Sequence, residues 1–241
     1  MMDGYSSLHM KKIYRGLGNL AAGALLALVI TLTSQAAAQD SASLTAKVVA
    51  EKGKARYSSD NKTWETLKKG KLLTAGSLIQ TGEGSMVDLA LGDSGDVLRI
   101  YASSVVGIDK LTSQPAQNGA QTETQLDLRN GRIMGQTHNL SAGSKYEIKF
   151  PYGVAGVQGG DFLLNSSGLV NVMSGAVVIA MPAADGSMVT RKVVSGFRFD
   201  PATRSVKPMP TEEEMKRPPK GGQQPSTRPA PSSIPPLRPG I

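Results

Sequence analysis

The 241-residue chain contains no cysteine and only two histidines, and aromatic residues make up just 5% of it. Without cysteine there can be no thiol nucleophile and no disulfide, so a folded domain must be stabilised by burial alone. One of the two histidines, His9, lies in the leader described next, and His138 is then the sole imidazole. One histidine without cysteine makes a structural zinc or redox-metal site improbable.

Residues 1–38 are interpreted as an export signal. Lys11, Lys12 and Arg15 form a basic start, an apolar run follows from Leu20 to Leu32, and three alanines precede Gln39. This order is typical of a cleaved secretory signal, with cleavage expected after Ala38 and Met10 as an alternative start. The rival is an uncleaved anchor, but the 13-residue apolar run is short of the roughly 20 residues that span a bilayer. We expect a periplasmic or secreted protein without a transmembrane segment after cleavage.

The charge of the chain is moderately positive. Removal of residues 1–38 takes away three basic residues and Asp3, so the formal net charge falls from +8 to +6. The mature chain lacks the dense Lys/Arg clusters that are typical of nucleic-acid binders, and no nucleic-acid partner is expected. Weak attraction to anionic envelope polymers or lipids remains an alternative to a merely soluble basic surface.

Short apolar segments, bounded by Gly, Ser, Asn or Asp, fill the chain between Gln39 and Asp200. No helical stripe of useful length follows the leader, so the pattern predicts an all-β domain over residues 45–200. The predicted strands are Thr45–Val49, Ala55–Tyr57, Leu78–Gln80, Met86–Leu91, Val97–Tyr101, Val105–Ile108, Thr124–Leu128, Arg132–Gln136, Tyr146–Phe150, Val154–Gln158, Asp161–Leu164, Leu169–Met173, Ala176–Met181, Val189–Val194 and Phe197–Asp200.

A short pattern recurs inside this body: an apolar residue, two further positions, a glycine, then apolar residues. The glycines are Gly70, Gly131, Gly175 and Gly196. Each is expected to form a corner of positive φ where one strand bends into the next. The spacing is 21 residues between the last two and 44 between the second and third. This favours a single coiled domain like a β-solenoid or β-roll, with a β-sandwich or jelly roll as the alternative.

The segment from Trp64 to Thr81, with Leu67, Gly70, Leu73, Gly76 and Ile79 at regular spacing, resembles the opening of FecR-like domains. The order of the later segments is similar too, so the resemblance covers about Val48 to Phe199. It implies an extracytoplasmic β module. Family members that regulate iron transport resemble membrane regulators with a cytoplasmic sigma-factor-binding domain, and at most 19 residues precede the apolar run here. The resemblance therefore implies a stand-alone FecR domain that lacks that cytoplasmic part.

One position departs from the family pattern. The family usually has a Gly-Thr pair shortly before a phenylalanine, whereas this chain reads Gly159-Gly160-Asp161-Phe162. Gly160 stands where the threonine is expected. Any recognition role of that threonine would be absent.

Composition changes sharply near Pro208. Ten of the 14 prolines lie between Pro208 and Pro239, among Gly, Ser, Gln and Arg. Such a segment offers little apolar surface to bury, so residues 208–241 are expected to be a disordered, proline-rich tail. It serves as a spacer in the first interpretation, and as a docking segment through Arg228 and Arg238 in the second.

The sequence assigns no catalytic, cofactor-binding or metal-binding residue, although three groups have side chains of a suitable type. Asp93-Ser94-Gly95-Asp96 could offer oxygens to calcium but is better explained as a β-turn. A triad through His138 would need Ser141 or Ser144, and a solvated loop histidine is the simpler interpretation. Lys145–Gly153 concentrates aromatic and charged residues and could line a ligand or partner surface. The core interpretation places Ile148 and Phe150 inside, followed by a turn over Pro151–Gly153.

These observations predict a non-enzymatic exported module without a cofactor. It is expected to bind or scaffold cell-envelope components, with a possible part in envelope signalling, and to receive a protein at an exposed sheet edge. Its partner is an envelope protein or a cell-wall polymer. The alternative is a carbohydrate-active or polymer-binding protein that acts on cell-wall glycans, since a glycosidase needs only two suitably spaced carboxylates.

Overall fold

The computed structural model describes residues 41–210, with residues 118, 139 and 184 excepted. The predicted export signal (1–38) and nearly all of the proline-rich tail (208–241) lie outside the described residues. Among the residues that are described, none belongs to a helix of the length and apolarity needed to cross a membrane. Every described element is a strand, which confirms the all-β prediction.

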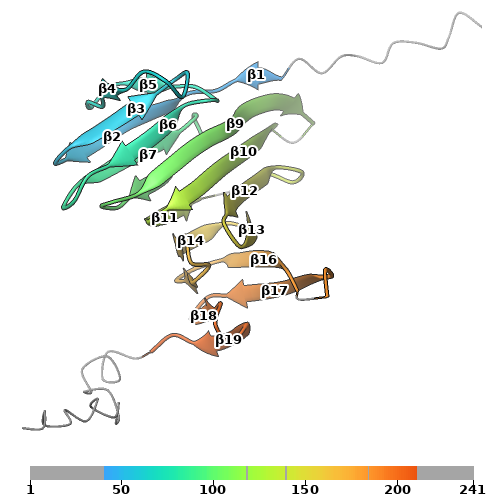
Figure 1. The fold of residues 1–241 in the computed structure, drawn as a ribbon. Coiled ribbons are helices and arrows are strands. Elements are labelled where there is room, and N and C mark those ends of the chain that lie inside the picture. The colour runs from blue at the N-terminus through green and yellow to red at the C-terminus, as the bar shows by residue number, and fades with distance from the viewer. Residues whose placement is uncertain (1–40, 118, 139, 184, 211–241) are drawn as a thin grey trace, which may run out of the picture. The chain divides into compact units, whose positions relative to one another are not determined.

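The strands form two sheets (Figure 1). Sheet A contains, in spatial order, β17 (Met188–Val194), β16 (Ala176–Pro182), β13 (Gly153–Val157), β12 (Lys145–Phe150), β10 (Gly119–Asn130), β9 (Val105–Ala116), β6 (Leu78–Thr81), β3 (Ala55–Ser58) and β4 (Glu65–Thr66), with β1 (Ala42–Ser43) paired to β9. Sheet B contains β19 (Ser205–Pro208), β18 (Phe197–Asp200), β15 (Val170–Val172), β14 (Gly160–Asn165), β11 (Arg132–Thr137), β8 (Asp96–Ile100), β7 (Met86–Leu91), β2 (Ala46–Lys52) and β5 (Leu72–Leu73).

The chain passes back and forth between the sheets. From β7 onward it lays down β7 and β8 in sheet B, β9 and β10 in sheet A, β11 in sheet B, and so on in alternation to β18 and β19. Both sheets are therefore built in chain order toward β17 and β19. The described pairs are antiparallel except β10 with β12, which is parallel because the chain crosses to β11 between them.

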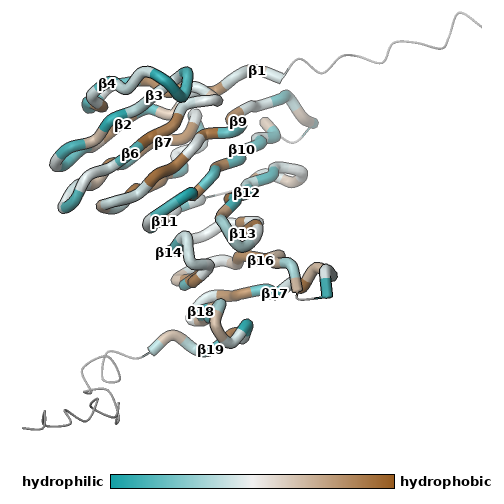
Figure 2. Tube along the Cα trace, in the orientation of Figure 1, coloured by the Kyte–Doolittle hydropathy of each residue, from teal (hydrophilic) through white to brown (hydrophobic). Residues whose placement is uncertain are grey.

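One hydrophobic core is shared by the two sheets. Inward residues alternate with outward ones, as in β8, where Leu98 and Ile100 are fully buried and the residues between are partly exposed. Tyr146 of sheet A meets Phe162 of sheet B edge to face, with ring centroids 6.3 Å apart. In Figure 2 brown stretches alternate with paler and teal ones along the strands. The alternation of buried and partly exposed residues along β8 is the period-2 pattern of a sheet with one buried face.

Every predicted strand is present, and β7 and β18 have the predicted bounds. The prediction missed the short β1, β4, β5 and β19, and it made β9 and β10 too short. Both run for twelve residues. Their added part is rich in Gln, Ser and Thr and is held by polar cross-strand pairs such as Lys110 with Glu123. A prediction from apolar periodicity does not detect strands that are held by such polar pairs.

The four predicted glycine corners have φ between 72° and 88°. Gly175 also lies against another turn, because a Cβ placed there would be 1.9 Å from the Gly159 carbonyl oxygen. At the facing turn, a Cβ on Gly160 would be 2.1 Å from the Ser174 carbonyl oxygen. Gly160 has a φ of 93° as well. A threonine at this position would require the facing turn to move.

Serine hydroxyls join chain segments that are distant in sequence at both ends of the strands, and no local sequence pattern predicts these bonds. Ser85 accepts a hydrogen bond from the Lys54 N–H at 2.8 Å, and Ser104 accepts one from Arg132 at 3.0 Å. Ser174 does the same for Asp161 at 2.8 Å. These bonds satisfy the backbone N–H of Lys54 in a turn and those of Arg132 and Asp161 at the starts of β11 and β14.

Candidate binding surfaces

The acidic turn at Asp93–Asp96 joins β7 to β8. Asp96 is buried, and its carboxylate accepts a hydrogen bond from the backbone N–H of His138 at 3.1 Å. The structure thus uses this carboxylate to fix a chain segment 42 positions away. No cluster of three or more potential metal-binding His, Cys, Asp or Glu side chains occurs in the described part of the chain. The turn interpretation accounts for the motif.

The loop after β11 does not assemble a triad from its own serines. Ser141 and Ser144 lie 2.7 Å apart through their hydroxyls. Ser144 accepts a bond from the Thr122 N–H, and Ser141 donates one to the Ala120 carbonyl. Both hydroxyls therefore hold the loop to β10, while the His138 side chain is exposed.

The aromatic block at Lys145–Gly153 forms β12 and the turn after it. Tyr146, Ile148 and Phe150 point into the core, and Tyr152 in the turn is exposed. Burial, with a smaller contribution from the charge of Asp96, raises the pKa of the Tyr146 hydroxyl. The core-and-turn interpretation of this block is confirmed.

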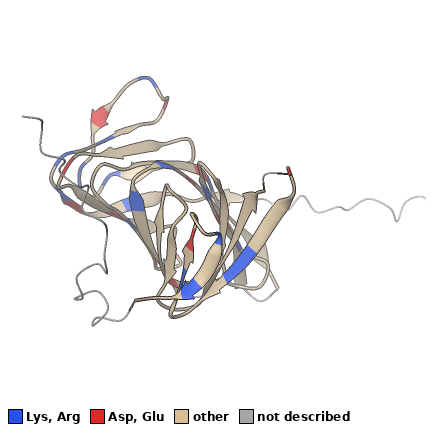
Figure 3. Ribbon diagram, turned by 60° about the horizontal axis from the view of Figure 1, so that its bottom comes forward, with Lys and Arg blue, Asp and Glu red and all other residues tan. Residues whose placement is uncertain are grey.

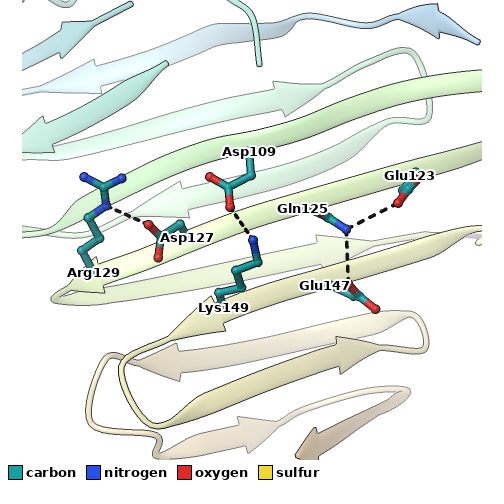
Figure 4. A network of polar contacts seen from close by, with 7 residues as sticks. All are labelled: Asp109, Glu123, Gln125, Asp127, Arg129, Glu147 and Lys149. Carbon is teal, nitrogen blue, oxygen red and sulfur yellow. Dashed lines mark hydrogen bonds and ion pairs between the residues drawn. The ribbon is translucent and has the colours of Figure 1, made fainter. Parts of the chain in front are cut away.

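The outward side of β12 joins a polar network with β9 and β10 (Figure 4). Lys149 bonds Asp109 at 2.9 Å, and Gln125 donates to Glu123 and Glu147. The hydrogen bond and charge of Asp109 raise the pKa of Lys149. Blue and red segments lie near one another on several strands in Figure 3, in keeping with such pairing. These largely exposed pairs contribute little stability each.

The open end of sheet A is different, because β17 has a strand on one side only. Within residues 41–210, excluding the three gaps, β16 is the strand that pairs with it. The backbone N–H of Ala176 in β16 donates to the Gly159 carbonyl, and the Ala176 carbonyl accepts from Gln158, so Ala176 faces away from β17. The carbonyl of the neighbouring Gly175 accepts the N–H of Ser195. Odd-numbered residues of β17 therefore face β16, and Thr190 and Lys192 direct their backbone N–H and C=O groups outward.

The side chains of β17 add two features to this edge. Met188 is 61% exposed and Val194 is 42% exposed, whereas Val193, next to Val194, is fully buried. The basic pair, Arg191 and Lys192, is exposed. The strand has seven residues without a proline or bulge. It has the length and regularity that an added strand needs.

Comparison with known proteins places part of this domain in a family. Residues 77–178 match the family model described as "FecR protein". That match is narrower than the span from Val48 to Phe199 over which the motifs resemble the family, and it begins one residue before β6. No curated protein matches the chain.

Two crystal structures of a "putative anti-sigma factor" from Parabacteroides distasonis have similar chains. They are 14% and 12% identical to this one, each with a TM-score of 0.41. Each comparison covers 54% of this chain and 57% of the other, so the match spans little more than half the length of those proteins. The family relationship is therefore limited to residues 77–178, which match the FecR family model.

Proposed function

We propose that this protein is an exported, non-enzymatic module that binds a cell-envelope protein at the open edge of β17. The leader sequence supports export to the periplasm or beyond. The FecR match supports a role related to envelope signalling. The partner would be a polypeptide, bound by strand addition, and no cofactor would be required.

The unpaired edge of β17 is the observation that carries this proposal. An incoming strand gains main-chain hydrogen bonds from the outward groups of Thr190 and Lys192. Its side chains meet Met188 and Val194, which supply exposed apolar surface. The exposed cations Arg191 and Lys192 favour an extended segment that carries acidic residues, and they disfavour pairing with a second copy of the same strand.

The test uses a proline that removes one outward donor. Thr190→Pro deletes an N–H that points away from β16, so the edge strand should still fold. Thr190→Ala is the matched control, since it keeps the N–H. Wild-type protein should capture a saturable partner from envelope extracts, Thr190→Ala should retain it, and Thr190→Pro should lose it. Capture of only salt-sensitive, nonspecific material would contradict the proposal, as would equal binding by the proline variant.

Polymer binding is the second candidate, and an excess of basic residues in the N-terminal part of the domain favours it. Retention on cell-wall glycans or anionic polysaccharides would support this function, and release of a cleaved product would add catalysis. Absence of both would leave the protein-binding role.

We also propose that the domain is a coil rather than two independently formed sheets. The order in which strands are added supports this proposal, since sheet A from β6 onward and sheet B from β7 onward grow in chain order. The glycine corners between successive layers fit the same description. In a β-sandwich interpretation this order would have no particular meaning.

A further inference from the structure

The excess of positive over negative charge in the domain comes from its N-terminal part. Residues 47–71 contain eight Lys or Arg and three Asp or Glu, whereas residues 72–210 contain eleven of each. The FecR match begins at residue 77, so the basic part precedes it. The eight basic residues are Lys47, Lys52, Lys54, Arg56, Lys62, Lys68, Lys69 and Lys71.

Two cavities collect part of this charge. The first, of about 570 Å³, has Lys54, Arg56 and Lys68 in its lining, and the second, of about 580 Å³, has Lys52 and Arg132. Neither lining includes an acidic residue. We call these five cations the basic surface. Each cavity has the size of a typical small-ligand site.

The two cavities adjoin at a pair of bonded turns. Lys52 lines one cavity and Lys54 lines the other, and the turn between β6 and β7 contributes to both. The Lys54 N–H bonds the Ser85 hydroxyl at 2.8 Å, and the Gly82 N–H bonds the Lys54 carbonyl at 2.8 Å. The bonded turns fix the spacing of the cations and so form one extended basic surface rather than two unrelated hollows.

Both arginines of the basic surface are stacked on aromatic rings. Arg56 lies 4.5 Å from the centre of the Trp64 ring, and Arg132 lies 4.4 Å from that of Tyr101. Stacking holds a guanidinium in place and leaves its edge to donate to a carboxylate. The hydrogen bond from Arg56 to Gln80 uses Nε, so it does not occupy the two terminal nitrogens.

The remaining lining suits the hydroxyl groups of sugars. Asn165, Ser166 and Ser167 line the second cavity, and Thr66 and Gln80 line the first. The hydroxyls of Ser85 and Thr81, also in these linings, already bond backbone groups. The Asn165 Oδ1 atom is buried and has no hydrogen-bond partner among the described residues. Such an atom is costly unless a donor reaches it. Glu51, which pairs with Lys68 at 3.2 Å, is a nearby acid, but this pair is exposed and weak.

We propose that the basic surface binds an anionic polysaccharide, with sugar carboxylates at the cations and sugar hydroxyls at the neutral polar groups. This inference rests on the polymer-binding function above and is independent of the edge of β17. The Thr190→Pro variant should therefore bind the polysaccharide as the wild type does. Failure of polysaccharide binding would therefore leave strand addition at β17 untouched, and the reverse also holds.

The single tryptophan provides a built-in reporter, because Trp64 contacts Arg56. The protein is titrated with polygalacturonate at physiological ionic strength while its tryptophan emission is recorded, with neutral dextran as the negative control. Polygalacturonate should shift the emission saturably, and dextran should not. Absence of a saturable shift, together with absence of heat in calorimetry, would overturn the proposal.

Matched variants then locate the site. Lys54→Gln/Arg56→Gln and Arg191→Gln/Lys192→Gln each remove two positive charges, one pair from the basic surface and one from β17. The first should weaken polygalacturonate binding by about tenfold or more, as measured by calorimetry, and the second by much less. Equal weakening would show that only net charge acts and would contradict the site. Polyphosphate that competes at equal affinity would overturn the assignment to a polysaccharide.

Discussion

The close approach of two turns makes Gly175 the most sensitive corner of the fold. A methyl group there meets backbone on the facing turn, with the Gly159 carbonyl oxygen at 1.9 Å and carbon at 2.6 Å. Gly196 has a similar φ, 83° against 72°, but a Cβ there meets nothing within 4 Å. The two positions share a conformation and differ in available space.

Substitution by alanine therefore separates the cost of the left-handed conformation from the cost of the steric clash. Gly196→Ala should lower the free energy of unfolding by about 1 kcal/mol, the cost of a left-handed alanine. Gly175→Ala adds a backbone displacement of about 1–3 kcal/mol, for a total near 3 kcal/mol. Urea denaturation followed by tryptophan emission measures both. Asparagine tolerates the left-handed conformation, so Gly196→Asn should cost less than Gly196→Ala, while Gly175→Asn should remain damaging. Equal losses at the two glycines would refute the close-approach argument.

Three further predictions concern stability. Tyr146→Phe should leave the unfolding free energy unchanged or raise it by about 1 kcal/mol, because the buried hydroxyl has no partner among the described residues; a large loss in denaturation would contradict this. The backbone N–H groups of Thr63 and Lys62 lower the pKa of Asp60, so its stabilisation is present above the unfolded pKa near 3.8 and is lost as pH falls further. Asp60→Ala should thus lower the thermal midpoint at pH 7, and the difference in midpoint from wild type should shrink below about pH 3.8. Thermal melts at several pH values measure this difference. Deletion of Glu212–Ile241 should leave the thermal midpoint nearly unchanged, and a large fall would mean that the tail packs on the domain.

The sequence predicted the parts of the fold that apolar periodicity controls. Met86–Leu91 was placed with its correct bounds, and Gly131 and Gly175 were recognised as corners, since both signals are local. Apolar periodicity does not reveal the end of β9 and the start of β10, because these segments are held by polar cross-strand contacts. Gln114 donates to Gln121 across the hairpin, and neither residue is part of the core.

The candidate sites depend on information that is not local. Which residues of β17 face outward follows from its register with β16, and no pattern within Met188–Val194 reveals it. The charge of residues 47–71 was visible in the sequence, but averaging over the whole chain gave a mildly basic protein and concealed it. The approach of Arg132 to Lys52 around one cavity depends on the stacking of turns from distant strands.

Amide hydrogen exchange at β17 tests the central claim most directly. The captured envelope partner is added to the wild-type protein, and exchange is followed residue by residue. Strand addition predicts that Thr190 and Lys192, whose N–H groups face outward, become protected, while Arg191, already bonded toward β16, changes little. Protection elsewhere with no change at Thr190 and Lys192 would contradict binding at this edge.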